Sequence, residues 1–585
     1  MDPLLGGFQI GVWAPNARSV ELVTTDGHLP MEAGDRGYWH ISLPDQVGLD
    51  YRFSIDGGEP RPDPRSPFQP HGIDGVSRKI DQDAFDWSDG RWSSPDLVDL
   101  IVYELHVGTF TAEGTFANVV EKLDHLVELG VNAIELMPVA EFSGDRGWGY
   151  DGVDLYAPHH AYGEPDDLKW LVDTCHSRGV AVILDVVYNH LGPSGNYLRE
   201  FGPYFTHRYA TPWGEAINLD GPGSDEVRAF FIDNALTWLA DYHFDGLRLD
   251  AVHAIVDTSA VHLLEELATR VAELAAVKGR NLFLIAESDL NDPRVVTPHR
   301  YGGYGMDAQW SDDFHHAVHA YLTGERAGYY ADFGSLSHVA AALSHAYVYD
   351  GRYSSFRDRR HGRPIGGLRG SRFLAYAQNH DQIGNRATGD RLSTLVSIAQ
   401  LKIVAALVLT APFVPMLFQG EEWAASTPFQ YFTDHADPQL AHAVSRGRRH
   451  EFESFGWSPD DVPDPQDEKT FLRSKLDWTE LNDASHAELL AWHRDLIALR
   501  RSEPALRDGD LGRIFVDHDE DERWLTMHRG DLVIAVNFAD EARSFREIAS
   551  DVILASSEPV AVDPLTLGPQ SVAVVTSRAT TRAIT

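Results

Sequence analysis

Cysteine is nearly absent from this sequence: Cys175 is the only one among 585 residues, so no disulfide can form within the chain. Cys175 falls in line with Leu168, Leu171 and Val172 at helical spacing, which predicts a small core side chain and not a catalytic thiol. A chain that uses no disulfide is typical of a reducing compartment, so we expect a cytoplasmic protein.

Long hydrophobic runs are missing as well. No stretch approaches the roughly 18 apolar residues of a membrane-spanning helix, and Met1–Leu5 lacks the basic and apolar regions that begin a signal peptide. Basic residues are few beside acidic ones, because 49 lysines and arginines against 88 aspartates and glutamates give a net charge of −39. Such a field repels nucleic-acid phosphates and anionic membranes, so we expect neither as a partner. A neutral substrate would be little affected by this negative field.

The sequence has more than one kind of structural pattern, and it is too long for a single hydrophobic core. Residues 1–85 alternate short β patterns with turns, which predicts an N-terminal β-sandwich, and residues 86–98 read as a linker. Residues 99–505 alternate short apolar strands with amphipathic helices. Residues 506–585 return to β patterns and predict a C-terminal β-sandwich.

The strand candidates within residues 99–505 are mostly continuous apolar runs, as expected for a parallel sheet that is covered on both faces. A helix predicted over Phe116–Leu129 would end at Gly130, and another would begin with Ser224 as its N-cap. Seven clear strands and one weaker strand predict a (β/α)₈ TIM barrel with a short insertion after the third strand. The clear candidates are 100–107, 131–138, 180–187, 246–252, 282–287, 373–377 and 414–419, and the weaker one is 308–310.

Ionisable residues follow several of these strands at the point where the apolar run stops. The third strand runs into Asp185–His190, and the fourth carries Arg248 and Asp250. Glu287 ends the fifth, and residues 379–381 follow the seventh. Because the carboxyl ends of barrel strands meet at one mouth, these groups predict an active site there. Each acid alone is equally compatible with a strand-end cap or a salt bridge.

Glycoside hydrolysis requires two carboxyl groups in different protonation states. Arg248 and Asp250 stand two residues apart and point the same way on a strand, so the arginine would hold Asp250 ionised, as a nucleophile requires. Glu287 follows an apolar run, and partial burial would raise its pKa, as suits a proton donor. Asp381 would then hold sugar hydroxyls while positive charge develops.

The four strand-end segments resemble the four signature regions of the α-amylase family, in the order that this family has. The resemblance covers nearly the whole chain and implies that Asp250 is the nucleophile, Glu287 the acid/base and Asp381 the transition-state stabiliser. It implies further residues around the sugar, namely Tyr150, His190, Arg248 and His380. Trp148 precedes Tyr150 by two residues, where an aromatic ring would stack on a sugar face.

Finer features resemble one group of that family, the maltooligosyl-trehalose trehalohydrolases. They are carried by residues 251–255, 377–386 and 418–429 and by the basic run 446–449. This resemblance implies retaining hydrolysis of the α-1,4 bond next to a terminal trehalose, with release of trehalose and a maltooligosaccharide. Four residues become candidates for selecting trehalose, namely His253, Gln382, Glu422 and Trp423. For Glu422, packing at a strand end stays an equal alternative.

No cofactor is expected. Members of the α-amylase family often bind calcium through an asparagine in the place of Asn189, together with a large domain after the third strand. That domain is reduced here, so we expect no obligatory calcium and a structural hydrogen-bonding role for Asn189. The histidines show no spacing that builds a zinc site, so no metal site is predicted. The resemblance also implies a maltooligosyl-trehalose synthase that makes the substrate.

Other functions stay open at this point. The N-terminal module is similar to carbohydrate-binding modules and to that of glucan branching enzymes. Branching enzymes, however, typically have another residue in place of His253 and Ser-His-Asp in place of residues 379–381. A general α-amylase is a further alternative. An inactive glycan-binding protein is the last, and the paired acids argue against it because binding alone requires none.

Overall fold

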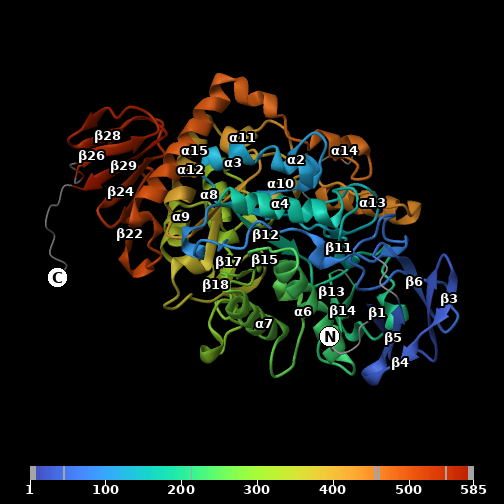
Figure 1. Ribbon diagram of the computed structural model, residues 1–585. Coiled ribbons are helices and arrows are strands. Elements are labelled where there is room, and N and C mark those ends of the chain that lie inside the picture. Colours follow the sequence, from blue (N-terminus) through green and yellow to red (C-terminus); the bar gives the residue numbers. More distant parts are fainter. Residues whose placement is uncertain are drawn as a thin grey trace.

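The computed structural model describes residues 8–43, 47–212, 214–453, 458, 461–546, 548 and 550–577. A closed barrel of eight parallel strands lies in the middle of the molecule, with smaller sheets of the N-terminal part on one side and of the C-terminal part on the other (Figure 1). The predicted fold class is confirmed. Met1–Leu5, on which the expectation of no signal peptide depends, lies outside the described residues.

The eight barrel strands are buried at every residue, because side chains fill the barrel on one face and helices cover the other. The weaker candidate is a true barrel strand, since β17 pairs with both β16 and β20. The strands are β8 Val102–Leu105, β9 Ala133–Leu136, β12 Ala181–Val186, β15 Gly246–Leu249, β16 Phe283–Ala286, β17 Ala308–Trp310, β20 Phe373–Tyr376 and β21 Val414–Phe418.

Helices connect successive strands around the barrel, and no helix among the described residues is long and apolar enough to cross a membrane. Cys175 lies buried on α4, as the sequence predicts for a core residue. The longer helices are α4 Pro165–Ser177, α6 Ser224–Ala240, α7 Leu263–Lys278, α8 Asp312–Thr323, α9 Leu336–His345, α12 Ile398–Thr410, α13 Pro438–Glu453 and α15 Ala484–Ser502.

Two helix predictions were wrong in detail. The helix expected over Phe116–Leu129 is divided into α2 Phe116–Val120 and α3 Leu123–Leu129, and Val127 on α3 is 39% exposed. Gly130 does end α3, with a φ of 99° that only glycine adopts readily. The N-cap of α6 is Gly223 in place of Ser224, which lies inside the first turn.

The N-terminal part forms two small antiparallel sheets, one of three strands and one of four. Arg61 joins this part to the barrel domain through an ion pair with Glu200, and the Tyr38 hydroxyl donates to Glu226 on α6 at 2.6 Å. One sheet contains β1 Phe8–Trp13, β5 Tyr38–Leu43 and β4 Glu32–Ala33, and the other contains β3 Gly27–Pro30, β2 Val20–Thr24, β6 Asp50–Ile55 and β7 Ser77–Arg78.

The C-terminal part is tied to the barrel by a buried arginine. Arg529 on β23 donates to the carbonyl of Thr410, the last residue of α12, and to the carbonyls of Ala505 and Asp508. Its side chain therefore supplies hydrogen bonds that the end of a helix leaves open. The strands are β22 Ile514–Asp519, β23 Trp524–Arg529, β24 Leu532–Asn537, β29 Ser571–Ser577 and β26 Ser550–Ala555 in one sheet, and β25 Arg543–Phe545, β28 Leu565–Leu567 and β27 Ala561–Val562 in the other.

Candidate active site

Arg248 is the centre of the acidic cluster at the carboxyl ends of the barrel strands. Its Nη1 donates to both carboxylate oxygens of Asp185, at 2.9 and 2.8 Å, and to Oδ1 of Asp250 at 3.0 Å. Its Nη2 lies 3.2 Å from Oε2 of Glu287, and the guanidinium stacks 4.1 Å from the centroid of the Trp310 ring. One buried cation therefore holds three acids from neighbouring strands together.

Parallel pairing explains why these groups meet. Asp185 on β12 lies directly opposite Arg248 on β15. Asp250 and Glu287 each follow the last residue of their strand, so both emerge at the same rim. The backbone N–H of Ala251 donates to Glu287 Oε2 at 2.6 Å, and Ala251 adopts a φ of 41°. The turn after β15 therefore positions both carboxyl groups.

The pKa of Glu287 is affected most by burial.

 Burial raises the pKa of its carboxyl well above the usual value, and Arg248 opposes this rise. The negative charges of Asp250, Asp381 and Asp312 raise it further. This upward shift favours the protonated form of Glu287, which is the state that a proton donor requires.

Asp250 accepts hydrogen bonds from two sides. Besides Arg248, the side-chain amide of Asn189 donates to its Oδ2 at 2.7 Å and to its backbone carbonyl at 2.9 Å. The structural hydrogen bonds expected of Asn189 are present, and they fix the orientation of the candidate nucleophile. Sequence reasoning did not foresee this partner.

Tyr150 and His380 form one wall of the site. The Tyr150 hydroxyl donates to Asp185 Oδ2 at 2.6 Å, and its ring stacks on His380 with centroids 5.2 Å apart. Burial alone would lower the pKa of His380, but the carboxylate of Glu104, bonded to its Nδ1, outweighs burial and raises it. His190 is anchored by its Nε2 against the carbonyl of Tyr150 at 3.0 Å.

Asp381 lies in the first turn of α10, His380–Gly384, and its side chain is exposed. Asn379 caps this helix by accepting from the backbone N–H groups of Asp381 and Gln382, at 2.9 and 3.2 Å. The side chain of Asn385 donates to Asp381 Oδ1 at 2.6 Å. The cap therefore fixes the backbone at Asp381, whose negative charge raises the pKa of Glu287. His253 is exposed as well, and it lowers the pKa of nearby Asp289.

The structure contradicts the prediction that Glu422 and Trp423 bind the sugar. Glu422 and Trp423 are both 0% exposed. Glu422 accepts hydrogen bonds from Tyr103 and pairs with His125, while Trp423 packs against Trp478. The turn after β21 directs both side chains into the protein, so packing, the alternative left open for Glu422, is what the structure shows.

Trp148 and Gln382 have supporting positions. The Trp148 ring stacks on Phe429 and meets His380 edge-on, and its Nε1 donates to the carbonyl of Gln430, so it packs behind the wall and is not the predicted stacking platform. Gln382 uses its Oε1 to accept from the Asn379 N–H at 3.0 Å. Its exposed fraction is only 7%, so it holds the cap of α10.

Several residues of the site were missed. Glu104 on β8 holds His380, and Asp312 at the start of α8 lies close enough to raise the pKa of Glu287. A carboxylate within an apolar strand, as at Glu104, is a signal that the sequence does offer, because a buried charge requires a partner. Nothing in the local pattern of Trp310 or Asp312 indicates their role.

Comparisons with known proteins agree with this geometry. Residues 79–210 match the model of the alpha amylase catalytic domain, residues 2–68 that of carbohydrate-binding module 48 (isoamylase N-terminal domain), and residues 509–574 a domain of unknown function. A putative alpha amylase from Salmonella typhimurium superimposes with a TM-score of 0.91 at 36% identity, over 99% of both chains. A pullulanase from Paenibacillus barengoltzii, at 19% identity and a TM-score of 0.72, shares the fold over 99% of this chain and 96% of its own.

The fold and the acids around Arg248 define a glycoside hydrolase of the α-amylase family. Among curated relatives, the malto-oligosyltrehalose trehalohydrolase of Arthrobacter ramosus is 53% identical over 90% of this chain and 92% of its own. That of Mycobacterium tuberculosis is 49% identical over 94% and 96%. A 1,4-alpha-glucan branching enzyme of Corynebacterium jeikeium is only 27% identical, over 72% of this chain and 61% of its own. The chain belongs to the malto-oligosyltrehalose trehalohydrolase family.

Proposed function

We propose that this chain hydrolyses the α-1,4-glucosidic bond next to the terminal trehalose of maltooligosyl-trehalose, with retention of configuration. The family membership supports the substrate and the products, trehalose and a maltooligosaccharide. The observation that carries the mechanism is the set of contacts from Arg248 to both Asp250 and Glu287, because it brings two carboxyl groups into one site, where burial raises the pKa of Glu287.

The first step forms a covalent intermediate. A carboxylate oxygen of Asp250 attacks the anomeric carbon of the glucose unit next to trehalose, and the bond from that carbon to O4 of trehalose breaks. Glu287 gives its proton to this O4, so trehalose leaves as a neutral alcohol. The remaining maltooligosaccharide is then held as an ester of Asp250.

The second step reverses the roles. Glu287, now a carboxylate, takes a proton from water while the water oxygen attacks the same anomeric carbon. The bond to Asp250 breaks, and a maltooligosaccharide with the original α configuration leaves. Asp381 opposes the positive charge of both transition states. Tyr150, His190 and His380 would surround the sugar whose bond is cleaved.

We further propose that the barrel module spans residues 99–505, between sandwiches at 1–85 and 506–585 joined by a linker at 86–98. A cytoplasmic location is supported by the buried single thiol of Cys175. A synthase that builds maltooligosyl-trehalose would supply the substrate, which places the reaction in trehalose biosynthesis.

The test gives the purified full chain maltotriosyl-trehalose and maltopentaose in parallel and follows the products by chromatography. We expect rapid release of trehalose from the first and slow attack on the second. Asp250→Asn should release none, with its fold intact by circular dichroism. Equal attack on both substrates would indicate a general amylase, a change in branching without trehalose would indicate a transferase, and full activity of Asp250→Asn would overturn the mechanism.

A further inference from the structure

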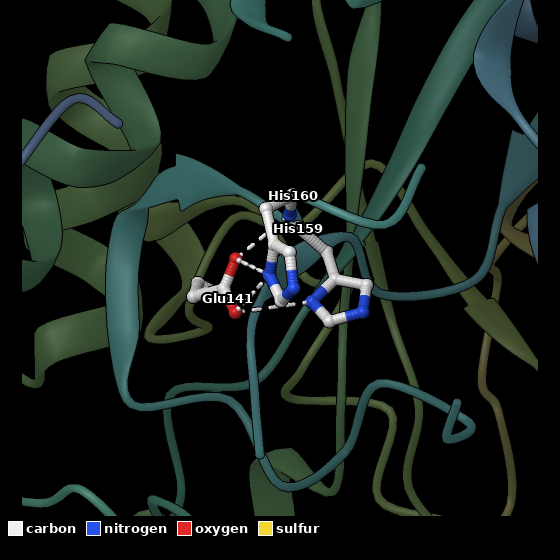
Figure 2. A group of neighbouring side chains, drawn as sticks. All are labelled: Glu141, His159 and His160. Carbon is white, nitrogen blue, oxygen red and sulfur yellow. Dashed lines mark hydrogen bonds and ion pairs between the residues drawn. The ribbon is translucent and has the colours of Figure 1, made fainter. Parts of the chain in front are cut away.

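A second polar cluster lies outside the acidic site and uses residues that the proposed mechanism does not need. Glu141 ends the short strand β10, Ala140–Glu141, and His159 and His160 follow β11, Asp154–Pro158. The two strands pair antiparallel, with Ala140 opposite Pro158. This pairing brings Glu141 against two histidines that stand 18 and 19 residues away in the sequence, which is why their spacing did not indicate a site. Figure 2 shows the carboxylate facing both rings.

The three side chains present their donor atoms to one another. Glu141 Oε1 lies 3.2 Å from His159 Nδ1 and 2.8 Å from His160 Nδ1. One donor atom from each residue falls within 4.8 Å of the other two. A tetrahedral zinc ion with bonds of about 2.0–2.1 Å separates its ligands by roughly 3.3 Å. The two carboxylate–imidazole separations, 3.2 and 2.8 Å, lie about 0.1 and 0.5 Å below that value.

We propose that Glu141, His159 and His160 bind one divalent transition-metal ion, with Zn²⁺ as the ion that fits best. Two imidazoles and a carboxylate are a donor set that zinc uses, and they leave a fourth position for water. Harder ions such as Ca²⁺ and Mg²⁺ prefer six or more oxygen ligands, which this cluster does not offer.

The surroundings of the cluster match those of metal sites. Glu141 and His159 have side chains that are 0% exposed, whereas His160 is 23% exposed and leaves a path for the ion to enter. The ring of His159 stacks on Phe142, which fixes its orientation. Asp145 Oδ1 lies 3.3 Å from His160 Nε2, on the side away from the cluster. A carboxylate behind a ligating histidine is the usual outer partner that orients the ring.

The ion would have a structural role. Residues 142–158 leave Glu141 and return at His159, and this segment carries Trp148 and Tyr150 of the wall beside His380. The two ends are already joined by the bond from the His159 N–H to the Val139 carbonyl at 2.7 Å. A metal ion bound by Glu141, His159 and His160 would cross-link the two ends of this segment and so oppose its opening. The site is independent of the proposed substrate.

The test uses the full chain after treatment with a chelator and dialysis. Zn²⁺ is titrated by calorimetry, bound metal is counted by mass spectrometry, and Co²⁺ is added separately to record the visible absorption of a four-coordinate site. We expect one tight equivalent, the Co²⁺ spectrum, and a rise in the midpoint of thermal unfolding with Zn²⁺. Binding of less than one equivalent would overturn the proposal and leave the cluster as a hydrogen-bonded group.

Two variants and one matched control test where the ion binds. His160→Gln should abolish the tight equivalent and the Co²⁺ spectrum. Asp145→Asn, whose side chain is 79% exposed and so should not disturb folding, should weaken Zn²⁺ binding by about 10- to 100-fold. His28→Gln is the matched control, because His28 also pairs with a glutamate through Nδ1, at 2.8 Å on the surface. Equal binding by Asp145→Asn and His28→Gln would refute the assignment, even if His160→Gln failed to fold.

Discussion

At the scale of single residues, the site depends on charges that act on one another. Arg248 contacts Asp185, Asp250 and Glu287 at once, and no lysine could do the same with its single ammonium group. The sequence predicted Asp250, Glu287 and Arg248 because each lies where an apolar strand ends. It could not predict Asn189 as the partner of Asp250, since that contact crosses between two strands.

The pH dependence of hydrolysis should report the proton on Glu287. The protonated form is the active form, so kcat/KM should hold as pH rises and fall once pH passes the raised pKa of Glu287. Asp312→Asn removes a negative charge that raises this pKa, so the alkaline limb should move to lower pH. The measurement is the pH profile of kcat/KM with maltotriosyl-trehalose. Asp241→Asn, at the C-cap of α6, should leave the limb in place, and an upward shift in Asp312→Asn would contradict the assignment of the acid.

At the scale of elements, short-range patterns predicted strands better than helices. Most barrel strands were predictable because burial on both faces favours an apolar run, whereas β17, in which polar Gln309 separates Ala308 from Trp310, was the weaker candidate. The helix over Phe116–Leu129 was not, since a break costs little where each half still buries one face. Glu422 and Trp423 follow a strand end, as Asp250 and Glu287 do, and only the turn after β21 shows that they point inward.

The packing of α10 against Trp148 sets the position of the candidate stabiliser, Asp381. A Cβ at Gly384 would lie 2.0 Å from two ring atoms of Trp148, so Gly384→Ala must displace either the ring or the helix. We expect a loss of kcat/KM of about tenfold or more, because displacement of a reacting group by about 1 Å costs up to 10²-fold. Steady-state kinetics measures it.

Gly447 on α13 provides the control for this substitution. A Cβ there meets no atom within 4 Å, so Gly447→Ala should keep full activity and stabilise the helix by up to about 1 kcal/mol. If both alanine variants lost activity alike, the tight contact with Trp148 would not be the reason.

At the scale of the whole molecule, a buried charge network joins the segment that precedes the barrel to residues before the amino ends of barrel strands. Asp89 accepts from His176 and His243, at 2.8 and 2.9 Å, and pairs with Arg280 at 3.0 Å. Burial alone would raise the pKa of Asp89, but these three partners outweigh it and hold the pKa well below the usual value. Its contribution to stability is therefore complete above about pH 4 and is lost as pH falls through the lowered pKa.

Asp89→Asn should destabilise the protein by about 3–5 kcal/mol near pH 7, because it leaves cations buried without their partner. The difference from the unmodified protein should begin to shrink below about pH 4, because the unfolded chain then takes up a proton at Asp89 while the folded carboxyl, with its lowered pKa, stays ionised. Calorimetric unfolding at pH 7 and pH 3.5 measures both effects. Asp124→Asn breaks only an exposed pair with Arg178 and should change stability by less than about 1 kcal/mol. A constant difference at both pH values would exclude the network as the cause.

The reach of Arg529 into the barrel limits how this protein can be recombined. Its guanidinium satisfies carbonyls of Thr410, Ala505 and Asp508, so a chain cut before β23 would lose the donors for all three. A chimera that exchanged the last sandwich for one from a distant relative would leave these carbonyls without donors, unless the new sandwich had an arginine at the position of Arg529. The barrel and its C-terminal sandwich should therefore be exchanged together, and the junction of an engineered chimera should lie before the barrel.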